Sequence, residues 1–141
     1  MPPGPAPDAA PRHQQRERAL SLLYEAEMKG ESPLEVLDAL AVPPDPYVRS
    51  LLAQVAATSE DADRRIAGAA EHWPLDRMAV VDRLVMRLAV AELLDPEGPP
   101  PAVVIDEAVE LAKVYSTEES GSFVNGILST VAADVERGPA R

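Results

Sequence analysis

Residues 48–69 read VRSLLAQVAATSEDADRRIAGA, and the spacing of the apolar side chains in this stretch decides the fold class. These side chains recur three or four positions apart, on one face of a helix, and only the small polar Ser59 interrupts them. The stripe consists of Val48, Leu51, Leu52, Val55, Ala62, Ile66 and Ala69. The pattern predicts one long helix that forms the spine of an all-α fold.

Two helices are expected before this spine. Residues 12–29 repeat apolar side chains at helical spacing, and Gly30 follows as a natural helix end. A shorter helix over residues 33–40 should begin at Pro33, with Ser32 as its N-cap.

Three more helices are expected after the spine. Residues 76–94 are apolar nearly all round, so this helix should be buried or lie against a partner. The prolines at 99–101 lead into a helix that runs to Tyr115. Ser116 and Glu119 have the spacing of a capping box in front of a last helix.

The domain organisation follows from length and proline content. The 141 residues, 46% of them hydrophobic, fit one compact domain. Five of the 15 prolines fall in the first 11 residues, so residues 1–11 should form a disordered or extended arm. We expect the helical domain over residues 12–137 and a loose tail over residues 138–141.

Composition excludes several classes of protein. The net charge of -11 and the pI near 4.5 argue against a protein that coats nucleic acid, although a local basic patch remains compatible with them. The absence of cysteine excludes disulfides, thiolate zinc sites and cysteine nucleophiles. No apolar run is long enough for a membrane span and no signal peptide is visible, so a cytoplasmic protein is expected.

Catalytic chemistry has little support in the sequence. The acidic pairs at 106–107 and 118–119 suit solvated helix positions better than a general acid and base. His13 and His72 lack the partner spacing of a helical metal site. There is no glycine-rich phosphate loop and no serine elbow, so we expect a binding protein without enzyme activity, cofactor or metal.

Positive charge is densest at residues 12–18, where three arginines and one histidine face a single acid, Glu17. Arg12 and Arg16 share a helix face, and we expect both side chains to be exposed. Arginine forks fit phosphate oxygens and stack on unpaired bases, so a few of them can recruit single-stranded RNA. The alternative is a solvated helix start, although cations at a helix N-terminus oppose its dipole.

An ordered set of short motifs resembles the NusB family of bacterial transcription antitermination factors. The motifs are RERAL (16–20), LYEA (23–26), WPLDRM (73–78), VDR (81–83), RLA (87–89), VIDEAVELAK (104–113), STEES (116–120) and FVNG (123–126). The resemblance implies two perpendicular helical subbundles of six to seven helices. It also implies binding to the single-stranded boxA element of nascent RNA together with ribosomal protein NusE. RNA polymerase and other Nus factors complete the complex, which supports processive ribosomal RNA transcription.

The resemblance also implies roles for individual residues. The RNA-binding residues would be Arg12, His13, Arg16, Arg18, Tyr24 and Phe123. The NusE-binding residues would be Asp82, Arg83 and Met86. For Phe123 the alternative to base stacking is simple core packing. Many relatives are more basic in this first helix, where this chain has Gln14 and Gln15, so its RNA affinity without NusE is expected to be weak.

Two other functions remain open from the sequence. An acidic helical homodimer that only scaffolds proteins would explain the net charge and the apolar helix over residues 76–94. A stand-alone relative of the RNA-binding domain of ribosomal RNA cytosine methyltransferases is the second alternative. Those enzymes continue into a Rossmann-like catalytic domain, whereas this chain ends at Arg141.

Overall fold

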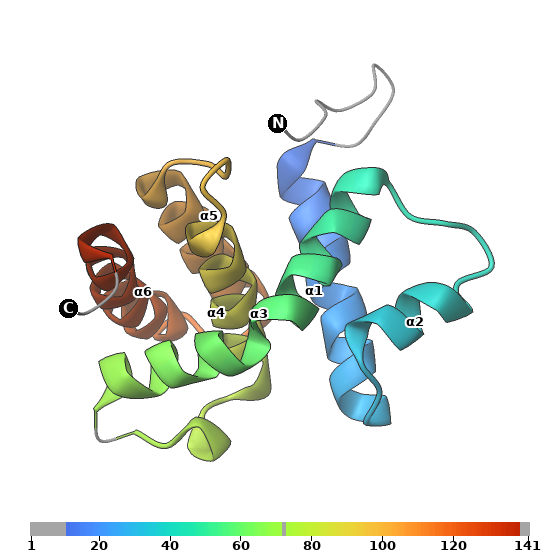
Figure 1. Cartoon of the computed structure of the whole chain (residues 1–141). Coiled ribbons are helices and arrows are strands. Elements are labelled where there is room, and N and C mark those ends of the chain that lie inside the picture. Colours follow the sequence, from blue (N-terminus) through green and yellow to red (C-terminus); the bar gives the residue numbers. More distant parts are fainter. Residues whose placement is uncertain (1–10, 72, 139–141) are drawn as a thin grey trace. The chain divides into compact units, whose positions relative to one another are not determined.

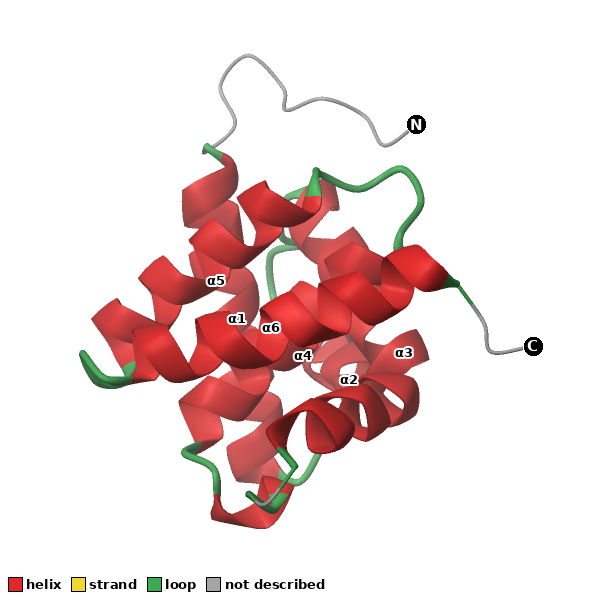
Figure 2. Ribbon diagram, turned by 90° about the vertical axis from the view of Figure 1, so that its left-hand side faces the viewer, coloured by secondary structure: helices red, strands yellow, loops and turns green. Residues whose placement is uncertain are grey.

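The computed structural model describes residues 11–71 and 73–138, and its regular elements there are all helical (Figure 1). In chain order they are α1 (Arg12–Lys29), α2 (Pro33–Ala39), α3 (Pro46–Ala70), the 3-10 helix η1 (Leu75–Arg77), α4 (Val80–Leu94), α5 (Pro101–Tyr115) and α6 (Ser120–Arg137). Figure 2 shows these helices joined by loops, without a strand in the described ranges. The all-α class and the number of helices are therefore confirmed. The predicted arm lies almost wholly outside the described residues.

The chain divides into two compact units, with the boundary between Ala57 and Thr58. Unit 1 contains α1, α2 and the first part of α3. Unit 2 contains the rest of α3, η1 and the helices α4, α5 and α6, which pack against one another. Two helical units agree with the two subbundles that the family resemblance implies.

The turn between α1 and α2 forms as its residue types predict. Gly30 adopts a left-handed φ of 66°, and the N–H of Glu31 bonds back to the carbonyl of Ala26. At the start of α2, the Ser32 hydroxyl accepts the N–H of Glu35 at 3.2 Å. The Glu35 carboxylate accepts the N–H of Ser32 at 3.3 Å. This capping box confirms Ser32 as the N-cap.

Helix α3 begins at an aspartate cap that the sequence analysis missed. Asp45 accepts the N–H of Tyr47 on its side chain at 2.8 Å and the N–H of Arg49 on its carbonyl at 3.1 Å. Pro46 takes the first helical position. The apolar stripe is buried as predicted at Val48, Leu51, Leu52, Val55, Ala62 and Ile66, and Ala69 is half-buried.

Helix α4 begins later than predicted. Instead of one helix from Asp76, the chain forms the short η1, and extended backbone at Met78 and Ala79 then separates η1 from Val80. The spacing of apolar residues does not reveal this break, because the buried Met78 continues the apolar pattern across it. Most side chains of α4 are buried, so its all-round apolar surface belongs to a central core helix.

The capping box at the start of α6 lies one residue later than predicted. Glu119 already has helical dihedral angles and makes no side-chain cap. The reciprocal pair is Thr117 and Ser120. The N–H of Ser120 bonds to Thr117 Oγ1 at 3.2 Å, and the N–H of Thr117 bonds to Ser120 Oγ at 3.4 Å. Ser120 Oγ also lies 3.1 Å from Ser116 Oγ.

Candidate functional site

The basic start of α1 in unit 1 is only partly exposed. His13 and Arg18 are exposed and Arg12 is half-buried. Arg16, which the sequence analysis expected on the surface, is 4% exposed. The expectation is wrong for Arg16 because its guanidinium turns toward the first turn of α3 rather than into solvent.

Tyr47 meets both arginines of the predicted patch. The Arg12 Cζ lies 3.6 Å from the centroid of the Tyr47 ring, in a cation–π contact. Arg16 Nη2 donates to Tyr47 Oη at 3.3 Å. Arg12 Nη1 also donates to Gln15 Oε1 at 2.7 Å, and Gln15 is 2% exposed. The unit thus gathers two guanidinium groups around one phenol ring.

Tyr47 was not among the site residues predicted from the sequence. It lies 31 residues from Arg16, and helical periodicity carries no information about contacts at that separation. The available local signal was an aromatic residue directly after Pro46, at the start of a predicted helix. Such a position fixes the backbone of Tyr47 but does not indicate what its ring contacts.

The other predicted RNA-binding residues are distributed over both units. His13 Nε2 lies 3.8 Å from Glu17 Oε1, one turn further along α1. Tyr24 is 42% exposed, further along the same helix. Phe123 belongs to unit 2, in the first turn of α6, and is half-buried. It is neither a free surface ring nor a fully enclosed core residue.

The predicted partner residues on α4 lie mostly inside the protein. Met86 is 0% exposed and Asp82 is 6% exposed, whereas Arg83 is half-buried. Asp82 Oδ2 accepts a hydrogen bond from Ser120 Oγ at 3.0 Å, and Asp82 Oδ1 is buried without a hydrogen-bond partner among the described residues. Of the three, Arg83 is the one whose side chain reaches the surface, and the role in NusE binding stays a prediction.

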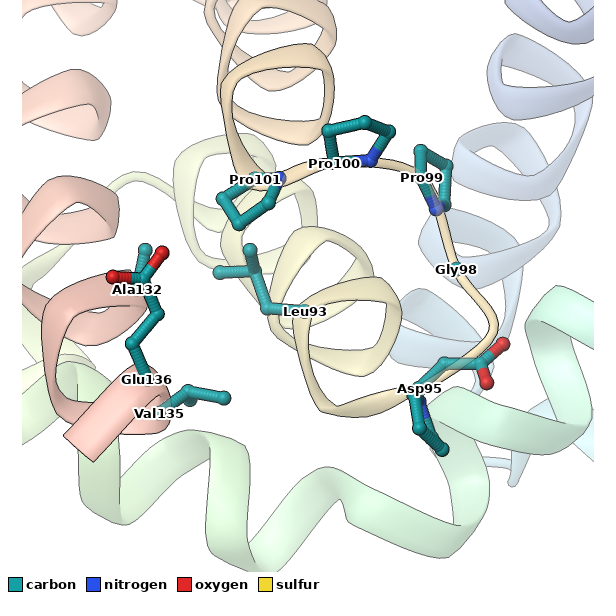
Figure 3. Close-up of a pocket in the computed structure, with 10 residues that line it drawn as sticks. Leu93, Asp95, Gly98, Pro99, Pro100, Pro101, Ala132, Val135 and Glu136 are labelled. Carbon is teal, nitrogen blue, oxygen red and sulfur yellow. The ribbon is translucent and has the colours of Figure 1, made fainter. Parts of the chain in front are cut away.

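Unit 2 has a pocket of about 330 Å³ between the loop after α4 and the end of α6 (Figure 3). It is lined by Leu93, Asp95, Pro96, Gly98, Pro99, Pro100, Pro101, Ala132, Val135 and Glu136. Its charged groups are carboxylates, which repel phosphate, and its lining has no nucleophile paired with a base. The pocket therefore does not extend the basic site.

Residues 11–71 and 73–138 contain neither a metal site nor a membrane-spanning helix. No cluster of histidine, aspartate and glutamate side chains there has the arrangement of a metal site. None of the helices described is both long and apolar enough to cross a membrane.

Residues 13–133 match the family model described as the NusB family. The chain belongs to the NusB family. This NusB match contains every predicted site residue except Arg12, which precedes it by one position. It confirms the resemblance drawn from the short motifs.

Individual NusB proteins match over most of their length. A protein of Saccharopolyspora erythraea named transcription antitermination protein NusB is 42% identical over 132 residues, covering 89% of each chain. The structure of T. maritima NusB matches with a TM-score of 0.79 and 37% identity, covering 89% of this chain and 92% of that one. A chain from the crystal structure of antitermination factors NusB and NusE in complex with dsRNA matches with a TM-score of 0.73 and 31% identity. That match covers 87% of this chain and 96% of the other.

Proposed function

We propose that this NusB family member is a transcription antitermination factor that binds boxA-type single-stranded RNA together with NusE. In this role it joins RNA polymerase and other Nus factors and supports processive ribosomal RNA transcription. The observation that carries the RNA part is the gathering of Arg12 and Arg16 around Tyr47 at the start of α1.

This constellation suits RNA better than protein because of its chemistry. Guanidinium groups bind phosphate oxygens through two parallel N–H donors, and the face of Arg12 opposite Tyr47 can stack on an unpaired base. Arg18 is exposed nearby on α1 and extends the positive surface, and the exposed His13 adds a ring that can contact RNA. Phe123, which belongs to unit 2, is by itself an aromatic ring on which a base can stack.

The charge balance argues for binding with a partner. The chain carries a net charge of -11, so positive potential is confined to a small area and few phosphates can be contacted. NusE is the proposed partner. A solved structure that is similar to this chain contains the antitermination factors NusB and NusE in complex with dsRNA. The proposed contact for NusE is the α4 region that contains Asp82, Arg83 and Met86, with Arg83 as the accessible side chain.

The homodimeric scaffold keeps the net charge as an argument but loses the apolar helix, the second of the two observations that favoured it. The apolar helix predicted over residues 76–94 suggested an interface, but α4 is the core helix of unit 2, and most of its apolar side chains are already buried. No other surface of the described residues singles out a second copy of the chain.

Fluorescence anisotropy with labelled RNA tests the proposed function. Three oligonucleotides are compared: a boxA single strand, a scrambled strand of the same composition, and a boxA duplex, each with and without saturating NusE. We expect the single boxA strand to bind most tightly and NusE to raise its affinity. Equal affinity for the boxA and scrambled strands, or no effect of NusE, would overturn the proposal.

A further inference from the structure

We propose that Tyr47 is a positioning residue of the RNA site, which is anchored by the buried Arg16 and holds Arg12 in the arrangement that meets RNA phosphate. This inference rests on the proposed function. It adds a residue on α3, outside the arginine-rich helix, that acts through Arg12 rather than on RNA directly.

The backbone of Tyr47 is held by local contacts that do not involve its side chain. Asp45 caps α3 through the N–H of Tyr47 at 2.8 Å, and the ring of Pro46, directly before Tyr47, fixes the φ angle of Pro46 at a helical value. Tyr47 therefore stands in the first, capped turn of a 25-residue helix. A ring on such a rigid element can define the position of a flexible arginine.

The arginines themselves need such a support. Arg12 and Arg16 lie one turn apart on α1, where like charges repel, and both stand near a helix N-terminus that disfavours cations. The electron-rich face of Tyr47 attracts the Arg12 guanidinium, and the phenol oxygen accepts from Arg16. One side chain thus offsets part of the repulsion between two charges.

The geometry also leaves the chemistry of Arg12 intact. All five N–H donors of a guanidinium lie in its plane, so a contact through its face uses none of them. Gln15 takes a bond from Arg12 Nη1, which restrains rotation of the group about the ring. Ordering a long side chain before RNA arrives lowers the entropy lost on binding.

Two substitutions separate the ring of Tyr47 from its hydroxyl. Tyr47→Phe keeps the face for Arg12 and removes the acceptor for Arg16, whereas Tyr47→Leu removes both. For the complex with NusE, we expect Tyr47→Leu to weaken boxA binding about two- to fivefold, the size of one exposed cation–π contact. Tyr47→Phe should retain most of the affinity.

A double-mutant cycle with Arg12→Ala distinguishes positioning from other roles. If Tyr47 acts through Arg12, Tyr47→Leu should have almost no further effect on RNA affinity once Arg12 is alanine. An undiminished effect in that background would mean that Tyr47 contacts RNA itself or only maintains the fold, and would overturn the inference. Arg64→Ala, which removes an exposed arginine in unit 2, is the matched control and should not couple to Tyr47.

A measurement without RNA keeps the inference testable if Tyr47→Leu folds poorly. The ring current of Tyr47 should shift the NMR signals of the Arg12 side chain upfield, and Tyr47→Phe should preserve that shift. Arg12 signals at their ordinary positions in the wild-type protein would overturn the inference.

The proposed function fails separately, if the wild-type complex with NusE does not prefer boxA RNA. Should boxA binding depend on Arg12 but not on Tyr47, only the inference about Tyr47 fails.

Discussion

Arg87 of α4 holds the carboxylate of Asp63 in α3 through two hydrogen bonds, from Nε to Oδ1 at 2.7 Å and from Nη2 to Oδ2 at 2.9 Å. The two side chains are 19% and 30% exposed, so water screens the pair only in part. Within unit 2 this paired geometry fixes the second part of α3 against the core helix.

Removing the carboxylate of Asp63 should destabilise the protein measurably. Asp63→Ala leaves the charge of a mostly covered arginine without this partner, and we expect a loss of about 1–3 kcal/mol in the free energy of unfolding. Asp61→Ala is the control, because Asp61 pairs with Arg64 and Arg65 at the surface and should lose about 0–1 kcal/mol. Urea denaturation of both variants gives the comparison, and equal losses would contradict the structural role of the Asp63 pair.

Asp61 should make a small contribution to the dependence of stability on pH. Hydrogen bonds from Arg65 and then Arg64 lower the pKa of the Asp61 carboxyl below its ordinary value. A lowered pKa stabilises the folded state above the ordinary range of an aspartate, and this contribution disappears as the pH falls through the lowered pKa. Asp61→Asn should therefore unfold more easily than the wild type at pH 7, with the difference shrinking at pH 3. A difference that grows at pH 3 would contradict this sign.

Arg12 and Arg16 should behave differently when each is replaced by alanine. Arg12→Ala should weaken RNA binding and reduce the slope of log affinity against log salt by about 0.7, and it should lower the melting temperature less than Arg16→Ala does. Arg16→Ala should lower the melting temperature, because Arg16 is 4% exposed and bonded to Tyr47. Arg64→Ala serves as the charge control for both assays. If it changes the salt slope as much as Arg12→Ala does, the site at α1 is wrong.

Phe123 should affect both RNA binding and folding. It is half-buried, so Phe123→Ala should destabilise the protein by less than the ~3–5 kcal/mol typical of a fully buried ring. If a base stacks on the ring, RNA binding should weaken by about 1–3 kcal/mol. Val114→Ala, at an exposed apolar residue of α5, is the control for both measurements. Wild-type RNA affinity in Phe123→Ala would remove Phe123 from the site.

Arg83 provides the sharper test of the proposed NusE contact on α4. Charge reversal at Asp82 would bury a cation next to Ser120, and unfolding would obscure any effect on the partner. Arg83→Glu changes a half-buried side chain and should weaken NusE association while leaving the melting temperature close to that of the wild type. Calorimetric titration with NusE measures this, and an unchanged affinity would place the interface elsewhere.

The sequence was sufficient to predict the helices and their ends where the structure depends on neighbouring residues. The apolar stripe from Val48 to Ile66, the Gly30 helix end and the Ser32 cap were all predicted correctly, because each depends on residues within a few positions of one another. The two errors at helix starts have local causes as well. Apolar Met78 concealed a break before α4, and Thr117 competed with Ser116 for the cap of α6.

The basic start of α1 could be predicted from the sequence, but its contact with α3 could not. Charge density identified the start of α1, but contacts between α1 and α3 bridge 31 residues of chain. Tyr47 and the burial of Arg16 both result from such a contact. The amphipathic pattern shows which side of a helix is apolar, but it cannot show that a cation will be drawn inward by a ring on another helix.

The hydroxyl of Ser120 carries a single hydrogen, and this limits how its hydrogen bonds can be arranged. The carboxylate of Asp82 cannot donate when ionised, so the hydrogen of Ser120 Oγ is directed to it across the 3.0 Å contact. Three further groups surround the same oxygen, namely the N–H of Thr117 at 3.4 Å and the hydroxyls of Ser116 and Thr117 at 3.1 Å and 2.9 Å, and its two lone pairs can accept from only two of them at a time. A carboxylate on one helix thus sets the direction of a hydroxyl group that closes the first turn of another.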